Sequence, residues 1–181
     1  MGSRTANNPK ALAWVQAQTA QGRVGAATLG EAAEFGELIV LATLGSQLAS
    51  AIASAGTEPF AGKVVMDATN PLDFSHGFPP RLLRERSESG GEEAQRLLPN
   101  ARVVKAFNTV GTGLMYRPSL AGGPGSMFIC GNDSAAKEVV AGVCRDFGWD
   151  AVDIGGIDAA GCLEAAAVIW IRLWLPSRCR R

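Results

Sequence analysis

The feature that most constrains the fold is a repeated pattern: a short apolar run, then small or turn-forming residues, then a stretch with helical character. The apolar runs are continuous rather than alternating, which is typical of parallel strands buried on both faces. Strands that alternate with helices predict a doubly wound α/β domain with a parallel sheet. The predicted strands span 24–27, 38–42, 64–66, 103–107, 127–130 and 151–154.

Helices are predicted between these runs. Asn8 suits the cap of the first helix, because its side chain can accept hydrogen bonds from free backbone N–H groups and Pro9 follows at the first helical position. The last helix is apolar on most sides, so it should be buried in the domain or in a dimer, and Pro176 should end it. Segments 73–80 and 87–93 are expected to be loops. The predicted helices span 8–22, 47–55, 133–148 and 163–175, with a short exposed helix at 81–86.

Composition and charge exclude several classes of protein. The 181 residues include 17 basic and 17 acidic side chains, so the net charge is zero. Nucleic-acid and membrane-surface proteins usually carry a basic excess, so neither partner is expected. No apolar stretch approaches the roughly 20 residues that span a bilayer. Met1–Ala13 lacks the apolar segment of a secretory signal and the four cysteines form no C-x-x-C pair, so we expect a cytoplasmic protein with reduced cysteines and no metal site.

A ligand site is predicted where the strands end, because ligands of open parallel sheets bind at the carboxyl ends of the strands. Three predicted strands are followed there by small, amide-bearing or proline-fixed residues, at 43–45, 67–71 and 108–111. Such residues let the backbone approach a flat ligand closely, but they supply no nucleophile, metal site or paired carboxylates. The pattern therefore indicates a cofactor or nucleotide crevice without a catalytic acid or base, and ordinary strand-to-helix turns remain the alternative.

Three titratable residues near these turns are assigned structural roles. His76, the single histidine, lies in a loop rich in proline and glycine and is expected to be exposed. Asp67 ends a predicted strand and should accept backbone hydrogen bonds rather than protons. Lys105 lies inside a predicted strand, and we expect its side chain to extend to the edge of the sheet.

Ordered motifs at 64–72, 101–109 and 127–133 carry a family resemblance, and residues 152–155, 163–164 and 170–171 follow the same pattern. With them, the chain resembles the NADP oxidoreductases that use the 8-hydroxy-5-deazaflavin coenzyme, from about residue 2 to about residue 174. The resemblance implies a Rossmann-type NADP-binding domain at 1–155 and a short helical segment at 156–181, often in a homodimer. It also implies hydride transfer between NADPH and the deazaflavin coenzyme or a flavin-like acceptor.

The resemblance assigns a site for the 2′-phosphate of NADP. Family members have Gly-Ser-Arg after the second strand, where the serine and the arginine hold this phosphate. Ser3, Arg4 and Thr5 fit that position here, and the acidic residue that would favour NAD is missing. An arginine suits a phosphate because it can donate two parallel, charge-assisted hydrogen bonds. A frayed end is the competing interpretation of these residues.

The resemblance and the strand-end positions together assign the rest of the cofactor site. No catalytic residue is assigned, because the cofactors carry the hydride chemistry and the protein supplies position and electrostatics. The residues expected along the cofactor are Thr43 and Leu44 beside the adenosine or its ribose, Asn70 and Pro71 beside the nicotinamide ribose, and Asn108, Thr109 and Val110 at the face of the ring.

The expected glycine-rich loop has no counterpart in the sequence. Gly111 and Gly113 begin a G-x-G-x-x-G pattern, but Tyr116 occupies its third glycine position. The resemblance therefore implies that the first strand and the helix N-terminus that holds the pyrophosphate are missing, as in a truncated reading of a longer protein. Arg172 also stands where the family commonly has histidine, and the chain closes early after it.

Three alternatives to this reductase remain open from the sequence. The chain could be a non-catalytic NADP-binding module, or an inactive fragment of such a reductase. It could also be an NADPH-dependent reductase of another acceptor, such as a flavin or a ferric chelate.

Overall fold

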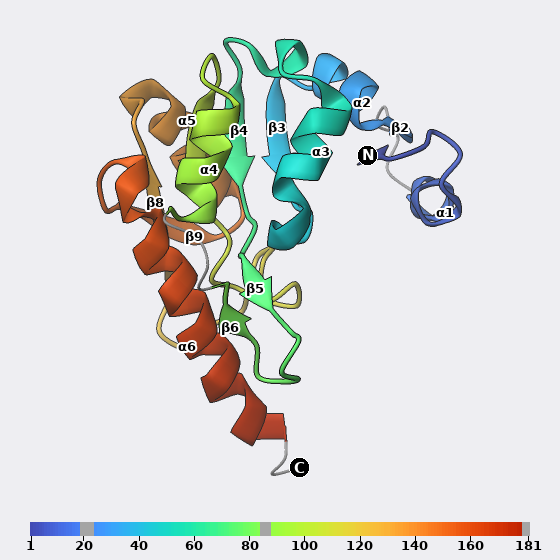
Figure 1. Cartoon of the computed structure of the whole chain (residues 1–181). Helices are drawn as coiled ribbons and strands as arrows, with labels where there is room; N and C mark the ends of the chain where they lie inside the picture. Colours follow the sequence, from blue (N-terminus) through green and yellow to red (C-terminus); the bar gives the residue numbers. More distant parts are fainter. Residues whose placement is uncertain (19–23, 84–87, 179–181) are drawn as a thin grey trace.

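Five strands form the central sheet of the computed structural model, which describes residues 1–18, 24–83 and 88–178 (Figure 1). Their order across the sheet is β3–β4–β7–β8–β9. β3 (Leu38–Leu41), β4 (Val64–Asp67) and β7 (Arg102–Lys105) are parallel, so their carboxyl ends lie at one edge of the sheet.

The direction of the last two strands differs from the prediction. β8 (Gly125–Gly131) is antiparallel to β7, and β9 (Trp149–Asp153) is parallel to β8. A parallel return needs a long crossover, usually a helix, to carry the chain over one face of the sheet. Residues 106–124, all of them described, consist of turns and loop, so the chain returns in the opposite direction.

Each face of the sheet is covered by its own apolar core, as a doubly wound domain requires. One core joins the sheet to α2 (Leu29–Phe35), α3 (Leu48–Ala55), α4 (Gly90–Leu97) and the first turns of α6 (Ala160–Arg178). The other core lies under α5 (Ser134–Asp146). The predicted α/β fold is therefore confirmed, with a sheet that is mostly rather than entirely parallel.

Two smaller parts flank the sheet (Figure 1). At the amino-terminal side, β1 (Gly2–Ser3) is parallel to β2 (Ala27–Thr28), and α1 (Pro9–Ala17) lies outside this pair. Below the sheet, β5 (Leu72–Asp73) pairs with β6 (Arg81–Leu82) in an antiparallel ladder.

Side-chain caps explain where most helices begin. The Asn8 carboxamide oxygen accepts from the backbone N–H groups of residues 10 and 11 at 3.0 and 3.2 Å, as predicted. The helix expected over 8–22 ends earlier, at Ala17, and residues 19–23, Gly22 among them, lie outside the described residues. Asp133 caps α5 by accepting from the N–H of Ala136 at 2.7 Å. Each of these bonds satisfies an N–H group that has no partner inside the helix.

Two helices were not predicted. α2 and α4 each begin with a capping box, which Thr28 and Glu31 form in α2 and Ser89 and Glu92 in α4. Because of the box at Ser89, part of the loop expected at 87–93 is helical. The S/T-x-x-E spacing in the sequence indicates both boxes. The short helix expected at 81–86 is wrong at its start, where the chain forms β6, and 84–87 lie outside the described residues.

α6 is buried only along its first part. Leu163 and Ala167 are buried, but Ile169 and Leu173 are 60% and 72% exposed, because the helix continues beyond the sheet (Figure 1). Pro176 does not end the helix as predicted, since α6 extends to Arg178. Among the helices of the described residues, none has the length and apolarity that crossing a bilayer demands.

Replacing two helical glycines by alanine should change the stability of the fold in opposite directions, because only one of them lies in a close contact between helices. A Cβ atom on Gly91 would lie 2.6 Å from the Cβ of Ala160, whereas one on Gly142 of α5 would meet nothing nearer than 3.8 Å. Gly91→Ala should therefore destabilise the fold by about 1–3 kcal/mol through overpacking. Gly142→Ala should stabilise it by up to about 1 kcal/mol, because alanine favours the helix. Urea unfolding of both variants tests this, and equal effects would contradict the packing.

Candidate functional site

Asn70 and Asn108 form a reciprocal amide pair at the carboxyl ends of β4 and β7. The Asn70 Nδ2 donates to the backbone oxygen of Asn108 at 2.8 Å, and the Asn108 Nδ2 donates to the Asn70 Oδ1 at 2.9 Å. The Asn108 Nδ2 also donates to the carbonyl oxygen of Leu163 on α6 at 3.0 Å. Two residues that the sequence assigned to the cofactor are thus held together by direct hydrogen bonds.

The turn after β3 packs against the same place. Gly45 is buried, and a Cβ atom there would lie 2.1 Å from the carbonyl oxygen of Asn70 and 2.7 Å from the nitrogen of Pro71. Only glycine permits this approach of two backbones. Before it, Thr43 is half-buried and Leu44 is 69% exposed. The ends of β3 and β4 are therefore contiguous, and β4 is joined to β7 by the amide pair.

An unusual backbone conformation precedes Asn108. Phe107 has a φ of 60°, in the left-handed region that a phenylalanine rarely adopts, and it is buried. Its ring packs edge-on against Phe147 with the ring centroids 5.5 Å apart. Such a conformation costs about 1–3 kcal/mol and persists only where packing enforces it, most often at functional sites. It turns the chain at the end of β7, before half-buried Thr109 and Val110, and nothing in the sequence pattern predicted it.

Three buried polar atoms at these strand ends have no hydrogen-bond partner among the described residues: the Oγ1 atoms of Thr43 and Thr69 and the Oδ1 of Asn108. An unpaired buried polar atom costs about 1–3 kcal/mol, so natural proteins seldom leave one without a purpose. Hydroxyl and amide groups of a nucleotide cofactor could pair with such atoms. These atoms make the strand ends a candidate place for a ligand that brings its own donors and acceptors.

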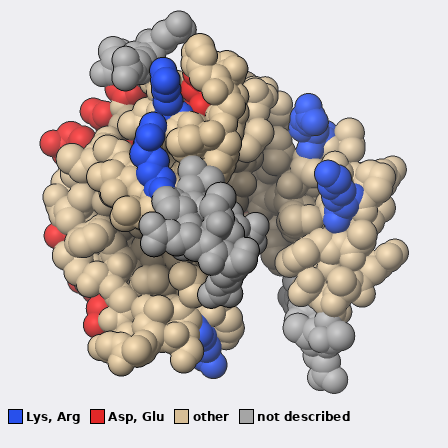
Figure 2. Space-filling view, turned by 90° about the horizontal axis from the view of Figure 1, so that it is seen from below, with Lys and Arg blue, Asp and Glu red and all other residues tan. Residues whose placement is uncertain are grey.

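The residues assigned to the 2′-phosphate lie apart from this cluster. Ser3 ends β1, and its Oγ donates to the backbone oxygen of Thr5 across a short turn. Arg4 and Thr5 are exposed in that turn. A groove separates β1 from β3, so the structure does not bring Ser3 and Arg4 into contact with the amide pair. Seen from below, the molecule is hollowed between its small amino-terminal part and the rest, with basic side chains on the small part (Figure 2).

The groove has a volume of about 360 Å³ and is mainly apolar, with Met1 and Gly2 on one wall and β3 on the other. The Met1 carbonyl accepts from Ala27 at 3.1 Å, and the Leu41 carbonyl accepts from Ala68 at 3.0 Å. Both carbonyls point away from the groove. Because backbone groups alternate in direction along a strand, the N–H and C=O groups of Gly2 and of Val40 face it. The groove thus lies between two strand edges with hydrogen-bonding groups turned toward it.

A buried ionic network lies beneath the amide pair and corrects the prediction for Lys105. The Lys105 side chain is fully buried instead of reaching the sheet edge, and its Nζ lies 2.7 Å from Asp67 Oδ2 and 2.9 Å from Glu164 Oε1. It also donates to the Thr69 carbonyl at 2.9 Å, so each of its three N–H groups has a partner. Asp67 accepts from the Thr69 N–H at 2.9 Å, as predicted. The sequence pattern missed the network because both acids lie far from Lys105 in sequence and meet it only in the folded chain.

The network sets the ionisation of Lys105. Burial alone disfavours its ammonium group, but Asp67 and Glu164 outweigh that effect and raise the pKa of Lys105 above its ordinary value. The lysine is therefore charged at neutral pH and is engaged as a structural cation.

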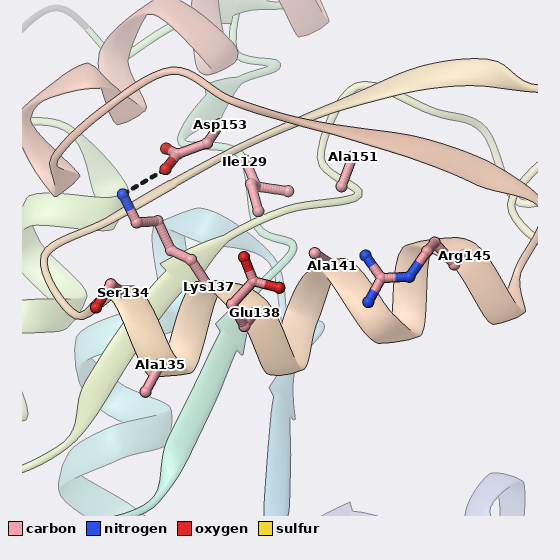
Figure 3. A pocket seen from close by; sticks show the side chains of 9 residues that line it. All are labelled: Ile129, Ser134, Ala135, Lys137, Glu138, Ala141, Arg145, Ala151 and Asp153. Atoms are coloured by element: carbon pink, nitrogen blue, oxygen red, sulfur yellow. Dashed lines mark ion pairs between the residues drawn. The ribbon is translucent and has the colours of Figure 1, made fainter.

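A second cavity of about 330 Å³ lies against α5, and none of the predicted residues lines it (Figure 3). Lys137 and Asp153, which both line it, form an ion pair at 2.6 Å, and the hydrogen bond from Lys137 lowers the pKa of Asp153. His76 is exposed, as expected. Among the described residues, no cluster of three or more His, Cys, Asp or Glu side chains could hold a metal ion.

Comparison with known proteins identifies the family. A solved structure from Arthrobacter sp. FB24, described as a candidate F420-dependent NADP reductase, is 41% identical and superposes with a TM-score of 0.85. The match covers 96% of this chain and 80% of that one. The chain belongs to the F420-dependent NADP reductase family. The F420-dependent NADP reductase of Methanocaldococcus jannaschii is 29% identical over 148 residues, or 79% of this chain.

Other comparisons set the limits of this assignment. The metalloreductase STEAP3 of Rattus norvegicus is 28% identical over 144 residues, which are 80% of this chain and 28% of that protein. The match to the Methanocaldococcus reductase covers 64% of its length, so this chain spans less than two thirds of either relative. A reductive aminase from Aspergillus terreus, 20% identical with a TM-score of 0.63, shares the fold. No family model matches the chain.

The buried network predicts that Lys105 matters far more to stability than a surface lysine. Lys105→Met leaves Asp67 and Glu164 buried without a cation, so unfolding free energy should fall by about 3–5 kcal/mol. Lys137→Met removes the more exposed pair with Asp153 and should cost about 0–1 kcal/mol. Urea unfolding compares the variants, and equal losses would contradict the buried ion pair.

The raised pKa of Lys105 also predicts an alkaline pH dependence. Because the pKa is higher in the folded state, the stabilisation is complete below the pKa of an unfolded lysine, about 10.4. It is lost as the pH rises through the higher folded value. The stability gap between the parent and Lys105→Met should therefore narrow above about pH 10.4 and stay constant from pH 7 to 9. A gap that narrows already between pH 7 and 9 would be inconsistent with a charged Lys105.

Proposed function

We propose that this chain is an NADP(H)-binding oxidoreductase that transfers a hydride between NADPH and a deazaflavin or flavin-like acceptor. The proposal is supported by family membership and by the polar side chains of Thr43, Asn70 and Asn108 at the ends of β3, β4 and β7. The observation that carries it is the Asn70–Asn108 pair, whose buried Asn108 Oδ1 has no partner among the described residues. That unpartnered acceptor suits a carboxamide or hydroxyl donor of the cofactor.

In this proposal, each assigned residue has a positioning role along the cofactor. Ser3, Arg4 and Thr5 hold the 2′-phosphate, and the open turn that contains them leaves Arg4 exposed for this purpose. The remaining residues follow the strand ends from the adenosine side to the nicotinamide side: Thr43 and Leu44, then Asn70 and Pro71, then Asn108, Thr109 and Val110.

The chemistry of hydride transfer comes from the nicotinamide when NADP(H) is bound. The residues of the chain bind and orient it. Asn70 and Asn108 fix the edge of the site through their mutual hydrogen bonds, and the strained turn at Phe107 directs the 108–110 loop. Apolar Pro71 and Val110 exclude water there. Because no proton is exchanged with the protein in a hydride transfer, no acid or base is assigned.

We also propose that the groove between β1 and β3 holds one further parallel strand, followed by the glycine turn that would receive the pyrophosphate. The occupant would be a segment that precedes Met1 in a longer form of the protein. Its support is the pair of strand edges that face the groove and the apolar walls between them. One strand could pair with both edges and join β1 and β2 to the main sheet.

A chimera tests the proposal for the groove. A strand–glycine turn–helix unit from a dinucleotide-binding domain, fused ahead of Met1, should raise both the melting temperature and the affinity for NADPH. A matched chimera with two prolines in the strand cannot pair with either edge and should give neither gain. Equal behaviour of the two chimeras would refute the proposed strand.

A ferric chelate is a second candidate acceptor, favoured by the likeness to the metalloreductase STEAP3. Assays of NADPH oxidation with the deazaflavin coenzyme, with flavin mononucleotide and with ferric citrate distinguish the acceptors. Binding of NADPH without turnover of any acceptor would support the non-catalytic module instead.

We further propose a homodimer that covers the exposed part of α6. Ile169 and Leu173 are apolar and largely exposed there. In this proposal, 1–155 form the nucleotide-binding part and 156–181 the helical segment that meets the second copy.

The assignment of Arg4 predicts a loss of selectivity between the two nicotinamide cofactors. Arg4→Ala removes charge-assisted hydrogen bonds to the 2′-phosphate, so NADPH should bind about 1.5–3 kcal/mol more weakly, or roughly ten- to hundredfold. NADH lacks that phosphate and should be unaffected. Calorimetric titration of both cofactors measures this, in the chain and in the strand chimera, with exposed Arg145→Ala as the matched control. An equal loss for NADH would remove Arg4 from the phosphate site.

A further inference from the structure

One turn of α6 contacts the end of β7, which carries one half of the amide pair. The carbonyl oxygen of Leu163 accepts from the Asn108 Nδ2 at 3.0 Å. The neighbouring Glu164 Oε1 lies 2.9 Å from the Nζ of Lys105, three residues before Asn108. Both contacts hold the end of β7 against the same turn of the helix.

Lys105 links the same turn of α6 to the end of β4. Its Nζ donates to the carbonyl oxygen of Thr69 at 2.9 Å, directly before Asn70, and pairs with Asp67 at 2.7 Å. The position of Asn70 is therefore fixed through the backbone of Thr69, and that of Asn108 through Leu163. The two amides meet because the network holds both of their backbones.

Glu164 is itself fixed in place by burial and by a second hydrogen bond. It is buried, and its Oε1 also accepts from the Gly91 N–H in the first turn of α4 at 3.3 Å. That N–H has no partner inside its own helix, and the amino end of a helix favours a negative charge. Any movement of Glu164 would leave a buried charge and a buried donor unpaired, which makes this arrangement rigid.

We infer that Glu164 and Lys105 are positioning residues that set the geometry of the Asn70–Asn108 pair from beneath the cofactor site. The inference rests on the proposed function for the meaning of that pair. Neither residue is a catalytic residue, because both act through the two asparagines. A shift of about 1 Å in a positioning group can cost on the order of a hundredfold in function.

Two Glu164 variants separate geometry from charge. Glu164→Ala removes the acceptor for Lys105 and Gly91, whereas Glu164→Gln keeps an acceptor oxygen at the same reach without the charge. Glu138→Ala, at an exposed position of α5, is the matched control. The readouts are the side-chain amide NMR resonances of Asn70 and Asn108 without cofactor, and the NADPH dissociation constant, both well below the unfolding temperature.

The expected pattern is specific to a positioning role. Glu164→Ala should shift both amide resonances and raise the NADPH dissociation constant about ten- to a hundredfold. Glu164→Gln should keep the amide resonances and the NADPH dissociation constant close to those of the parent. Glu138→Ala should change neither the resonances nor the dissociation constant. If Glu164→Ala does not fold, Glu164→Asp takes its place, because it withdraws the carboxylate by one methylene and should shift the same resonances.

Unchanged amide resonances in a folded Glu164→Ala or Glu164→Asp variant would overturn the inference, and so would an unchanged NADPH affinity. Failure of the proposed function shows itself separately, as absence of NADPH binding by the parent chain and the strand chimera alike. In that case the amide resonances alone decide whether Glu164 and Lys105 set the geometry of the pair.

Discussion

The buried ion pair of Lys105 with Asp67 and Glu164 is the interaction on which the rest of the site depends. It joins the ends of β4 and β7 to α6, and through Gly91 it also reaches the first turn of α4. Two carboxylates share one ammonium group there. The N–H at the start of α4 offsets part of the extra negative charge, so the electrostatics and the packing of the four elements are mutually dependent.

Close backbone contacts let these elements meet at the required distances. Gly91 allows α4 to approach α6, and Gly45 allows the turn after β3 to touch Asn70. The amide pair joins the strand ends that these contacts bring together. The result is one continuous edge of polar groups, some of them still without partners among the described residues, which suits a ligand that supplies its own donors and acceptors.

Much of this fold could be predicted from local patterns. Continuous apolar runs located β3, β4, β7, β8 and β9, although only β4 and β7 are buried along nearly their whole length. The antiparallel direction of β8 was not predicted; it follows from the 106–124 connection, whose turns and loop include no helix to carry the chain over one face of the sheet. The capping boxes at Thr28 and Ser89 were readable and were missed.

Some residues of the candidate site could likewise be predicted from the sequence, and others could not. Asn70 and Asn108 could be singled out because they follow strands that end at one edge, and the structure brings them together. The partners of Lys105 could not, because Asp67 and Glu164 lie far from it in sequence and a lysine in a strand usually reaches solvent. The left-handed Phe107 has no sequence signal either, since its conformation is enforced by tertiary packing.

In this account one cofactor lies over the carboxyl end of the strand proposed for the groove, from the turn at Ser3 and Arg4 to the amide pair. A crystal structure of the strand chimera with NADPH tests it most directly. The account predicts density for the 2′-phosphate at Arg4 and for the nicotinamide beside Asn70 and Asn108. A nucleotide bound elsewhere, for example in the cavity against α5, would contradict it.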